Sequence, residues 1–120
     1  MQMRKLGDYG EQLAMQYLRD KGYQIVTTNW HCPYGELDIV AWDNTVLVIV
    51  EVKTRRSRHR EDALSALTDK KRERLLAAAY AYLAAHDLEQ TAWRVDAIGI
   101  TSPHGKEPRI EHVEDALEWE

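Results

Sequence analysis

The sequence predicts an α/β fold in which helices flank a central sheet of mixed strand direction. Two observations predict it. Residues 35–53 form a run of two segments rich in β-branched residues and joined at Asp43-Asn44, and segments with apolar residues at helical spacing precede and follow this run. The expected order is helix, three strands, helix, two strands, with a helix for each face of the sheet. One domain over residues 1–120 is expected, since a chain of this length buries a hydrophobic core large enough to fold without disulfide bonds or a structural metal.

The central run reads as a β-hairpin. Asp43-Asn44 separates its two strands, and this dipeptide tolerates the positive φ of a tight turn. With a two-residue turn there, Glu36 lies directly opposite Glu51. Both faces of the hairpin are apolar near the turn, so the hairpin is expected at the centre of the sheet, covered on both sides.

Three carboxylates are predicted at the end of the hairpin far from the turn. Asp38 lies diagonal to Glu51, on the face that also carries Glu36 and Lys53. Acids this close repel one another. Lys53 offsets one charge, and a divalent ion with oxygen ligands, Mg²⁺ or Mn²⁺, would offset the rest. The alternative is a rim of solvated acids held by salt bridges to Lys53 and the arginines after it.

The order of these residues resembles a known signature. Asp38, followed thirteen positions later by Glu51-Val52-Lys53, resembles the PD-(D/E)xK signature of restriction-endonuclease-like nucleases, with Leu37 at the proline position. A wider set resembles the YraN-like family, small bacterial proteins related to Holliday-junction resolvases, over residues 7 to about 113. That set comprises Gly10-Glu11, Gly35-Glu36-Leu37-Asp38, Glu51-Val52-Lys53-Thr54-Arg55, Lys71 and Arg94-Val95-Asp96.

This resemblance implies a restriction-endonuclease-like fold and assigns roles to five residues. Asp38 and Glu51 would be the ligands of Mg²⁺ or Mn²⁺. Lys53 would orient or activate the attacking water, and Glu11 and Glu36 would be accessory acids. Glu11 borders the apolar stripe of the first helix, so its side chain is placed to reach the edge of the core.

The remaining elements follow from periodicity and from their end signals. Gly22 is a stop signal for the first helix, and Thr68 is an N-cap for the second. The fourth strand is expected to join the third in parallel through the second helix. The expected helices span residues 2–21 and 68–86, the outer strands residues 23–30, 92–101 and 109–113, and a surface loop residues 54–62.

The first turn of the second helix carries Lys70, Lys71 and Arg72, although the positive end of the helix dipole favours anions. Such a conflict with a local rule indicates a functional constraint, and a helix start with added cations suits a phosphate group. Lys71 lies on the apolar stripe four residues before Leu75, so it is expected to point toward the acids.

The net charge of −4 argues against a nucleic-acid partner, but the charge distribution favours one. Residues 55–74 hold eight of the 16 basic residues and four of the 20 acids. Such a patch beside a metal site suits a phosphodiester backbone. The alternative is a solvated loop and helix face. The predicted nucleic-acid-binding residues are Arg55, Arg56, Arg58, Arg60, Lys70, Lys71 and Arg72, with Arg74 beside them.

The leading functional hypothesis is a metal-dependent endonuclease acting on DNA, selective for a structure such as a junction or flap, in repair or recombination. The alternative is a nucleic-acid-binding accessory protein on a nuclease scaffold. The lone Cys32 and the lack of any long apolar run favour a cytoplasmic protein with no membrane partner. The sequence leaves open whether the protein forms a homodimer.

Overall fold

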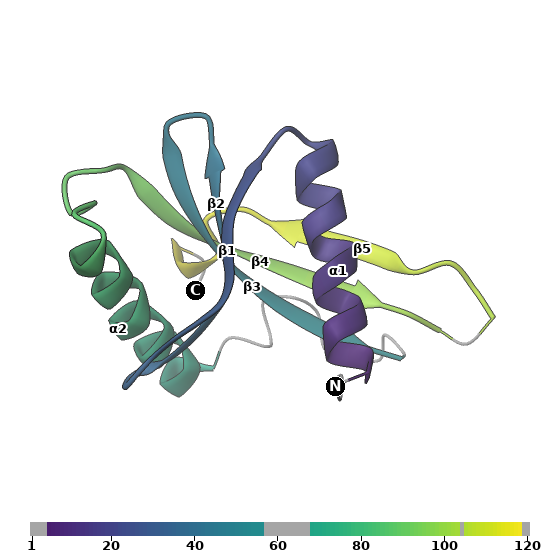
Figure 1. The fold of residues 1–120 in the computed structure, drawn as a ribbon. Coiled ribbons are helices and arrows are strands. Elements are labelled where there is room, and N and C mark those ends of the chain that lie inside the picture. The colour runs from purple at the N-terminus through teal and green to yellow at the C-terminus, as the bar shows by residue number, and fades with distance from the viewer. Residues whose placement is uncertain (1–4, 57–67, 104, 119–120) are drawn as a thin grey trace.

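The predicted element order is confirmed in the computed structural model, which describes residues 5–56, 68–103 and 105–118. Two helices flank a five-stranded sheet, and a short 3-10 helix follows the last strand (Figure 1). The elements are α1 (Lys5–Asp20), β1 (Gln24–Cys32), β2 (Gly35–Asp43), β3 (Val46–Arg55), α2 (Asp69–Ala85), β4 (Trp93–Thr101), β5 (Arg109–Val113) and η1 (Ala116–Glu118).

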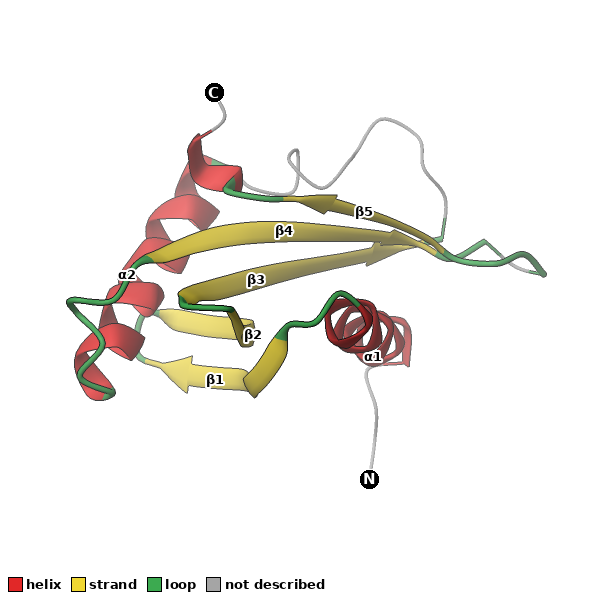
Figure 2. Ribbon diagram, turned by 90° about the horizontal axis from the view of Figure 1, so that it is seen from above, coloured by secondary structure: helices red, strands yellow, loops and turns green. Residues whose placement is uncertain are grey.

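The sheet has the strand order β1-β2-β3-β4-β5, as seen in Figure 2. β1, β2 and β3 form an antiparallel meander, β4 joins β3 in parallel after α2, and β5 pairs antiparallel to β4. The parallel pairing of the third and fourth strands is as predicted. It places the ends of β3 and β4 side by side.

The two helices cover opposite faces of the sheet. Alternate residues of β3 divide between two cores: Val48 and Val50 pack with α1, whereas Leu47 and Ile49 pack with α2. The described part of the chain contains no helix long and apolar enough to cross a membrane. The five residues predicted to face the core from α2 are all buried: Leu75, Ala78, Ala79, Tyr82 and Leu83.

The predicted hairpin turn was wrong by one residue. The turn consists of Asn44 and Thr45, since Asp43 still pairs with Val46. Asn44 takes the positive φ of 54°, and asparagine tolerates this conformation well. Moving the turn by one residue shifts the register by two, so each residue keeps its face but changes its partner.

The third strand is also longer than predicted. It continues to Arg55, which pairs with Thr101 of β4, so residues 54 and 55 belong to the sheet and not to the expected loop. Pairing with β4 satisfies the backbone of this polar stretch, which its side chains alone did not predict. The rest of that loop from residue 57 onward lies outside the described residues.

The sheet splits at the level of the acids. Pairing between β2 and β3 runs from the turn to Ile39 and Val50. Beyond that point β2 continues to pair with β1 as far as Gly35, while β3 continues to pair with β4 as far as Arg55. The first residues past the split are Asp38 on β2 and Glu51 on β3.

Candidate metal centre

Asp38 and Glu51 meet where the two strands separate. The index sum of the β2–β3 pairs places them at the same level, so Glu51 lies across from Asp38 and not from Glu36 as predicted. The Oδ2 atom of Asp38 accepts a hydrogen bond of 2.8 Å from the backbone N–H of Val52. This carboxylate therefore replaces a missing strand partner, and the bond fixes its position beside Glu51.

The environment of Glu51 disfavours a negative charge on it. Burial, the charge of Asp38 and a hydrogen bond with the Asp38 carboxyl raise the pKa of Glu51 from 4.5 to about 8, while the charge of Lys71 opposes this rise. Glu36 raises the same pKa further. The two carboxyl groups therefore form one coupled unit at neutral pH, as crowded acids do without a cation.

A cleft of about 220 Å³ adjoins this pair on the α2 side of the sheet. Glu36 and Glu51 contribute acids to its lining, and Lys71 and Arg74 from the start of α2 contribute bases. The helix starts at the predicted N-cap: Thr68 Oγ1 accepts a hydrogen bond of 3.4 Å from the Lys71 backbone N–H. Lys71 thus faces the acids, as its place on the helix predicted.

The donor set at the split suits a hard divalent cation. Among the described residues no group of three or more His, Cys, Asp or Glu side chains has the arrangement of a metal shell. Mg²⁺ commonly binds through one or two carboxylates and keeps several waters. The contacting carboxyl groups of Asp38 and Glu51 match that requirement, so these residues fit such an ion.

Two further predicted residues, Glu36 and Lys53, lie on the same face of the sheet as Glu51. Glu36 forms an ion pair of 3.7 Å with His31 of β1 when His31 is protonated. Lys53 follows Glu51 by two residues on β3, so strand alternation places it on the same face. Its action on water stays a prediction.

Glu11 is buried on α1, which covers the other face of the sheet. The adjacent Gly10 lies so close to β3 that a Cβ atom there would overlap the side chain of Thr54. This contact holds α1 against β3 three residues beyond Glu51. The role of Glu11 as an accessory acid stays a prediction.

The predicted basic residues do not form one uniform surface. Lys70 is exposed on the first turn of α2, whereas Arg72 Nη2 donates a hydrogen bond of 2.6 Å to the carbonyl oxygen of Leu117. Arg56 Nη1 donates at 3.4 Å to the carbonyl oxygen of Ser102. Arg58 and Arg60 lie outside the described residues.

Asn29 is a feature of the site that the sequence did not indicate. It lies on β1 directly across from Asp38, between two regular pairs of the β1–β2 register. Its φ is 52°, and its side-chain oxygen is buried without a hydrogen-bond partner. An unpaired buried polar atom often marks a functional position. Only the pairing of β1 with β2 shows that this asparagine lies at the same level of the sheet as the acids.

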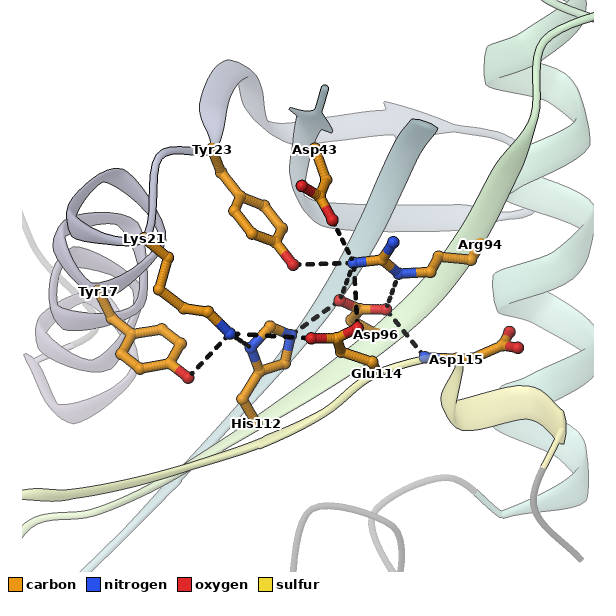
Figure 3. Close-up of polar contacts among 9 residues, drawn as sticks. All are labelled: Tyr17, Lys21, Tyr23, Asp43, Arg94, Asp96, His112, Glu114 and Asp115. Atoms are coloured by element: carbon orange, nitrogen blue, oxygen red, sulfur yellow. Dashed lines mark hydrogen bonds and ion pairs between the residues drawn. The ribbon is translucent and has the colours of Figure 1, made fainter. Parts of the chain in front are cut away.

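A second polar cluster lies on the α1 face and centres on Asp96, which is fully buried (Figure 3). Asp96 accepts hydrogen bonds from Arg94 Nε at 2.9 Å, from His112 Nε2 at 2.8 Å and from the Asp115 backbone N–H at 3.0 Å. Arg94 also donates to Tyr23 at 2.8 Å and to Asp43 at 3.1 Å. The cluster therefore joins five parts of the chain.

The contacts of His112 indicate its tautomer. Its Nε2 must carry the proton given to Asp96, and its Nδ1 lies 3.2 Å from the Lys21 ammonium, which has only protons to donate. Burial by itself raises the pKa of Asp96, but hydrogen bonds from His112, Arg94 and the Asp115 amide outweigh this and hold that pKa below its ordinary value of 3.8. Asp96 is a stable anion with a structural role.

We expect Glu51→Gln to make the metal-free protein more stable at high pH. Between pH 4.5 and about 8 the folded protein keeps a proton on Glu51 that the unfolded chain loses, so the free energy of unfolding falls as pH rises through this window. A glutamine at this position cannot ionise, so the variant does not lose this stability, which amounts to on the order of a few kcal/mol above the window. Urea unfolding in EDTA from pH 4 to 9 measures it. Equal pH dependence in both proteins would contradict the raised pKa.

The fold and the site define an α/β protein with a mixed five-stranded sheet and an acid-lined cleft where that sheet splits. The sequence matches the uncharacterised protein family UPF0102 over residues 10–100. The chain belongs to this family.

Relatives in several bacteria cover nearly the whole chain. A UPF0102 protein of Herpetosiphon aurantiacus is 48% identical over 111 residues, covering 89% of each chain. One from Roseiflexus castenholzii is 45% identical and covers 95% of this chain and 94% of its own. One from Renibacterium salmoninarum is 44% identical and covers 91% of this chain and 92% of its own.

Proposed function

We propose that this protein is a metal-dependent endonuclease that acts on DNA and selects a structure such as a junction or a flap. The observation that carries this proposal is the contact between the carboxyl groups of Asp38 and Glu51 at the split of the sheet. Two acids forced together at the edge of an open cleft destabilise the protein unless a cation compensates them. A hydrolytic metal site explains why the fold keeps them there.

Asp38 and Glu51 would hold Mg²⁺ or Mn²⁺. When bound, such an ion activates water and stabilises the charge that develops on a phosphodiester during hydrolysis. The chain's own residues hold and orient the substrate: Lys71 and Arg74 line the cleft opposite the acids and offer positive charge to a phosphate entering it. Lys53, on the same face as Glu51, is placed to orient the attacking water.

The test is a panel of labelled DNAs incubated with the protein and Mn²⁺: a linear duplex, a flapped duplex and a four-way junction. We expect cleavage of the branched substrates that EDTA abolishes. Binding of the same DNAs without any Mn²⁺-dependent cleavage would favour the alternative of an accessory protein, which needs the basic residues but no metal.

Lys71 and Lys70 provide a matched pair of variants on neighbouring positions of α2. Lys71 lines the cleft with Glu51, whereas Lys70, which is also exposed on the same helical turn, does not line it. We expect Lys71→Met to lower the cleavage rate at saturating DNA by about 10²-fold, the usual effect of removing one charge-stabilising group, with DNA affinity little changed. Lys70→Met should weaken binding and leave the saturated rate unchanged. Single-turnover kinetics separates the two effects, and identical behaviour of both variants would contradict this assignment.

A further inference from the structure

A second cleft lies on the sheet beyond the acids, at the far ends of β3, β4 and β5. Its volume is about 300 Å³. Arg55, Thr101 and Arg109 form a row across it, since Arg55 pairs with Thr101 and Thr101 pairs with Arg109. The buried Thr101 on β4 is therefore flanked by one arginine on each neighbouring strand. Among the described residues, the lining consists of Arg55, Gly99, Thr101, Arg109, Ile110 and Glu111.

Arg55 is the unusual member of this row. Its Nε and Nη1 atoms are buried, and neither has a hydrogen-bond partner. A buried N–H donor without a partner is costly, because it has lost its water and gained no other hydrogen bond in exchange. Arg94 of the same protein, by contrast, donates hydrogen bonds to Asp96, Asp43 and Tyr23. An anionic ligand would accept hydrogen bonds from the unpaired donors of Arg55 and so remove this cost.

The composition of the cleft suits a phosphate group. Arg55 and Arg109 contribute two positive charges and Glu111 one negative charge, so the described part of the lining is net positive. Arginine donors match the oxygens of a phosphate in geometry as well as in charge. Gly99 places no side chain on the floor, and the Thr101 hydroxyl lies between the arginines in the register of the strands.

The position of the cleft relative to the acids indicates which phosphate it binds. Arg55 follows Glu51 by four residues on β3, which corresponds to about 13 Å, and the even spacing puts both side chains on one face. A DNA strand rises about 3.4 Å per nucleotide. A strand cut at the acids would therefore pass over Arg55 a few nucleotides away.

We infer that this cleft binds a backbone phosphate of the nucleic-acid strand, a few nucleotides from the phosphodiester at Asp38 and Glu51. The choice of a nucleic acid as the ligand rests on the proposed function; the anion site itself rests on Arg55 and its neighbours. The site fixes the position of the strand without reading its sequence. It differs from the basic first turn of α2, which lies beside the acids.

The test uses the full chain in EDTA, with three variants. Arg55→Met removes the unpaired donors, Arg109→Gln removes the second arginine, and Arg19→Gln is a control on the exposed end of α1. Two probes are used: inorganic phosphate, followed by thermal unfolding, and a fluorescent DNA duplex, titrated at several salt concentrations. The phosphate probe needs neither metal nor catalysis.

We expect phosphate to raise the Tm of the wild-type protein and of Arg19→Gln, but not that of Arg55→Met. Without phosphate, Arg55→Met should melt at or above the wild-type Tm, since it removes two buried donors that have no hydrogen-bond partner. For the duplex, Arg55→Met and Arg109→Gln should each flatten the dependence of log K on log salt by about 0.9, the value for one phosphate contact. If Arg55→Met does not fold, the salt dependence measured with Arg109→Gln still tests the inference.

Unchanged phosphate stabilisation and an unchanged salt slope in both variants would overturn the inference. The proposed nuclease site is tested separately by Asp38→Asn, which should keep the full response to phosphate in EDTA. Loss of that response only in the arginine variants supports the anion site, whether or not the acids bind metal.

Discussion

Replacing Asp96 with alanine is expected to lower the free energy of unfolding by about 3 to 5 kcal/mol, the usual cost of leaving a buried charge without its partner. Asp96 is fully buried and accepts hydrogen bonds from Arg94, His112 and the Asp115 backbone. Its removal leaves the Arg94 Nε and the His112 Nε2 without their acceptor. Urea unfolding at pH 7 measures the loss.

The pH dependence gives this prediction a second readout. The pKa of Asp96 is below its ordinary value of 3.8, so the folded protein holds this anion more strongly than the unfolded chain does. The stabilisation is present above pH 3.8 and is lost as the pH falls through the lower, folded value. Glu89→Ala, in the exposed loop after α2, is the control. A loss in Asp96→Ala no larger than in this control would show that the cluster does not stabilise the fold.

Asp38→Asn and Glu51→Gln are each expected to abolish Mn²⁺ binding at the split of the sheet, because each removes a charged oxygen ligand. Both replacements keep the size of the side chain. Asparagine at 38 still offers an oxygen to the Val52 backbone N–H, which Asp38 now accepts at 2.8 Å, so the local fold should survive. Isothermal titration calorimetry compares the variants with the wild-type protein.

The control for metal binding is Glu89→Gln, which removes one exposed acid and should bind Mn²⁺ as the wild-type protein does. Circular dichroism shows whether each variant is folded. Wild-type Mn²⁺ affinity in both Asp38→Asn and Glu51→Gln would mean that the acids form a salt-bridged rim and that the electrostatic basis of the proposal is wrong.

The architecture was predictable because its signals are local. The buried stripe of α2 follows from helical spacing, and its start follows from the N-cap Thr68; both are confirmed. The apolar faces of the hairpin predicted its central position with a helix on each side. That the acid pair shares one face also followed from strand alternation, which survives a register shift of two.

What the sequence did not predict depends on pairing between distant segments. The choice between Asp43-Asn44 and Asn44-Thr45 as the turn decides whether Glu36 or Asp38 lies across from Glu51, and local propensity separates these turns only weakly. The order of strands in the sheet places Asn29 across from Asp38, and it brings Asp96 into hydrogen-bonding distance of His112. Neither pair has a spacing that marks it in the sequence.

The cleft at Arg55 shows the same limit. The charge pattern predicts Arg55 in a surface loop, as part of a basic patch that binds nucleic acid, whereas the structure places it in β3, level with Arg109 of β5 across one intervening strand. No periodicity connects residues 55 and 109. Only the parallel pairing of β3 with β4 and the antiparallel return of β5 bring them together.

The most direct test of the central claim is an anomalous-scattering experiment on crystals of the wild-type protein soaked in Mn²⁺. The account predicts an anomalous difference peak between the carboxyl groups of Asp38 and Glu51, at about 2.0 to 2.3 Å from an oxygen of each. A soaked crystal with no peak there, and with Glu51 held in an ion pair with Lys71 in its place, would contradict the account.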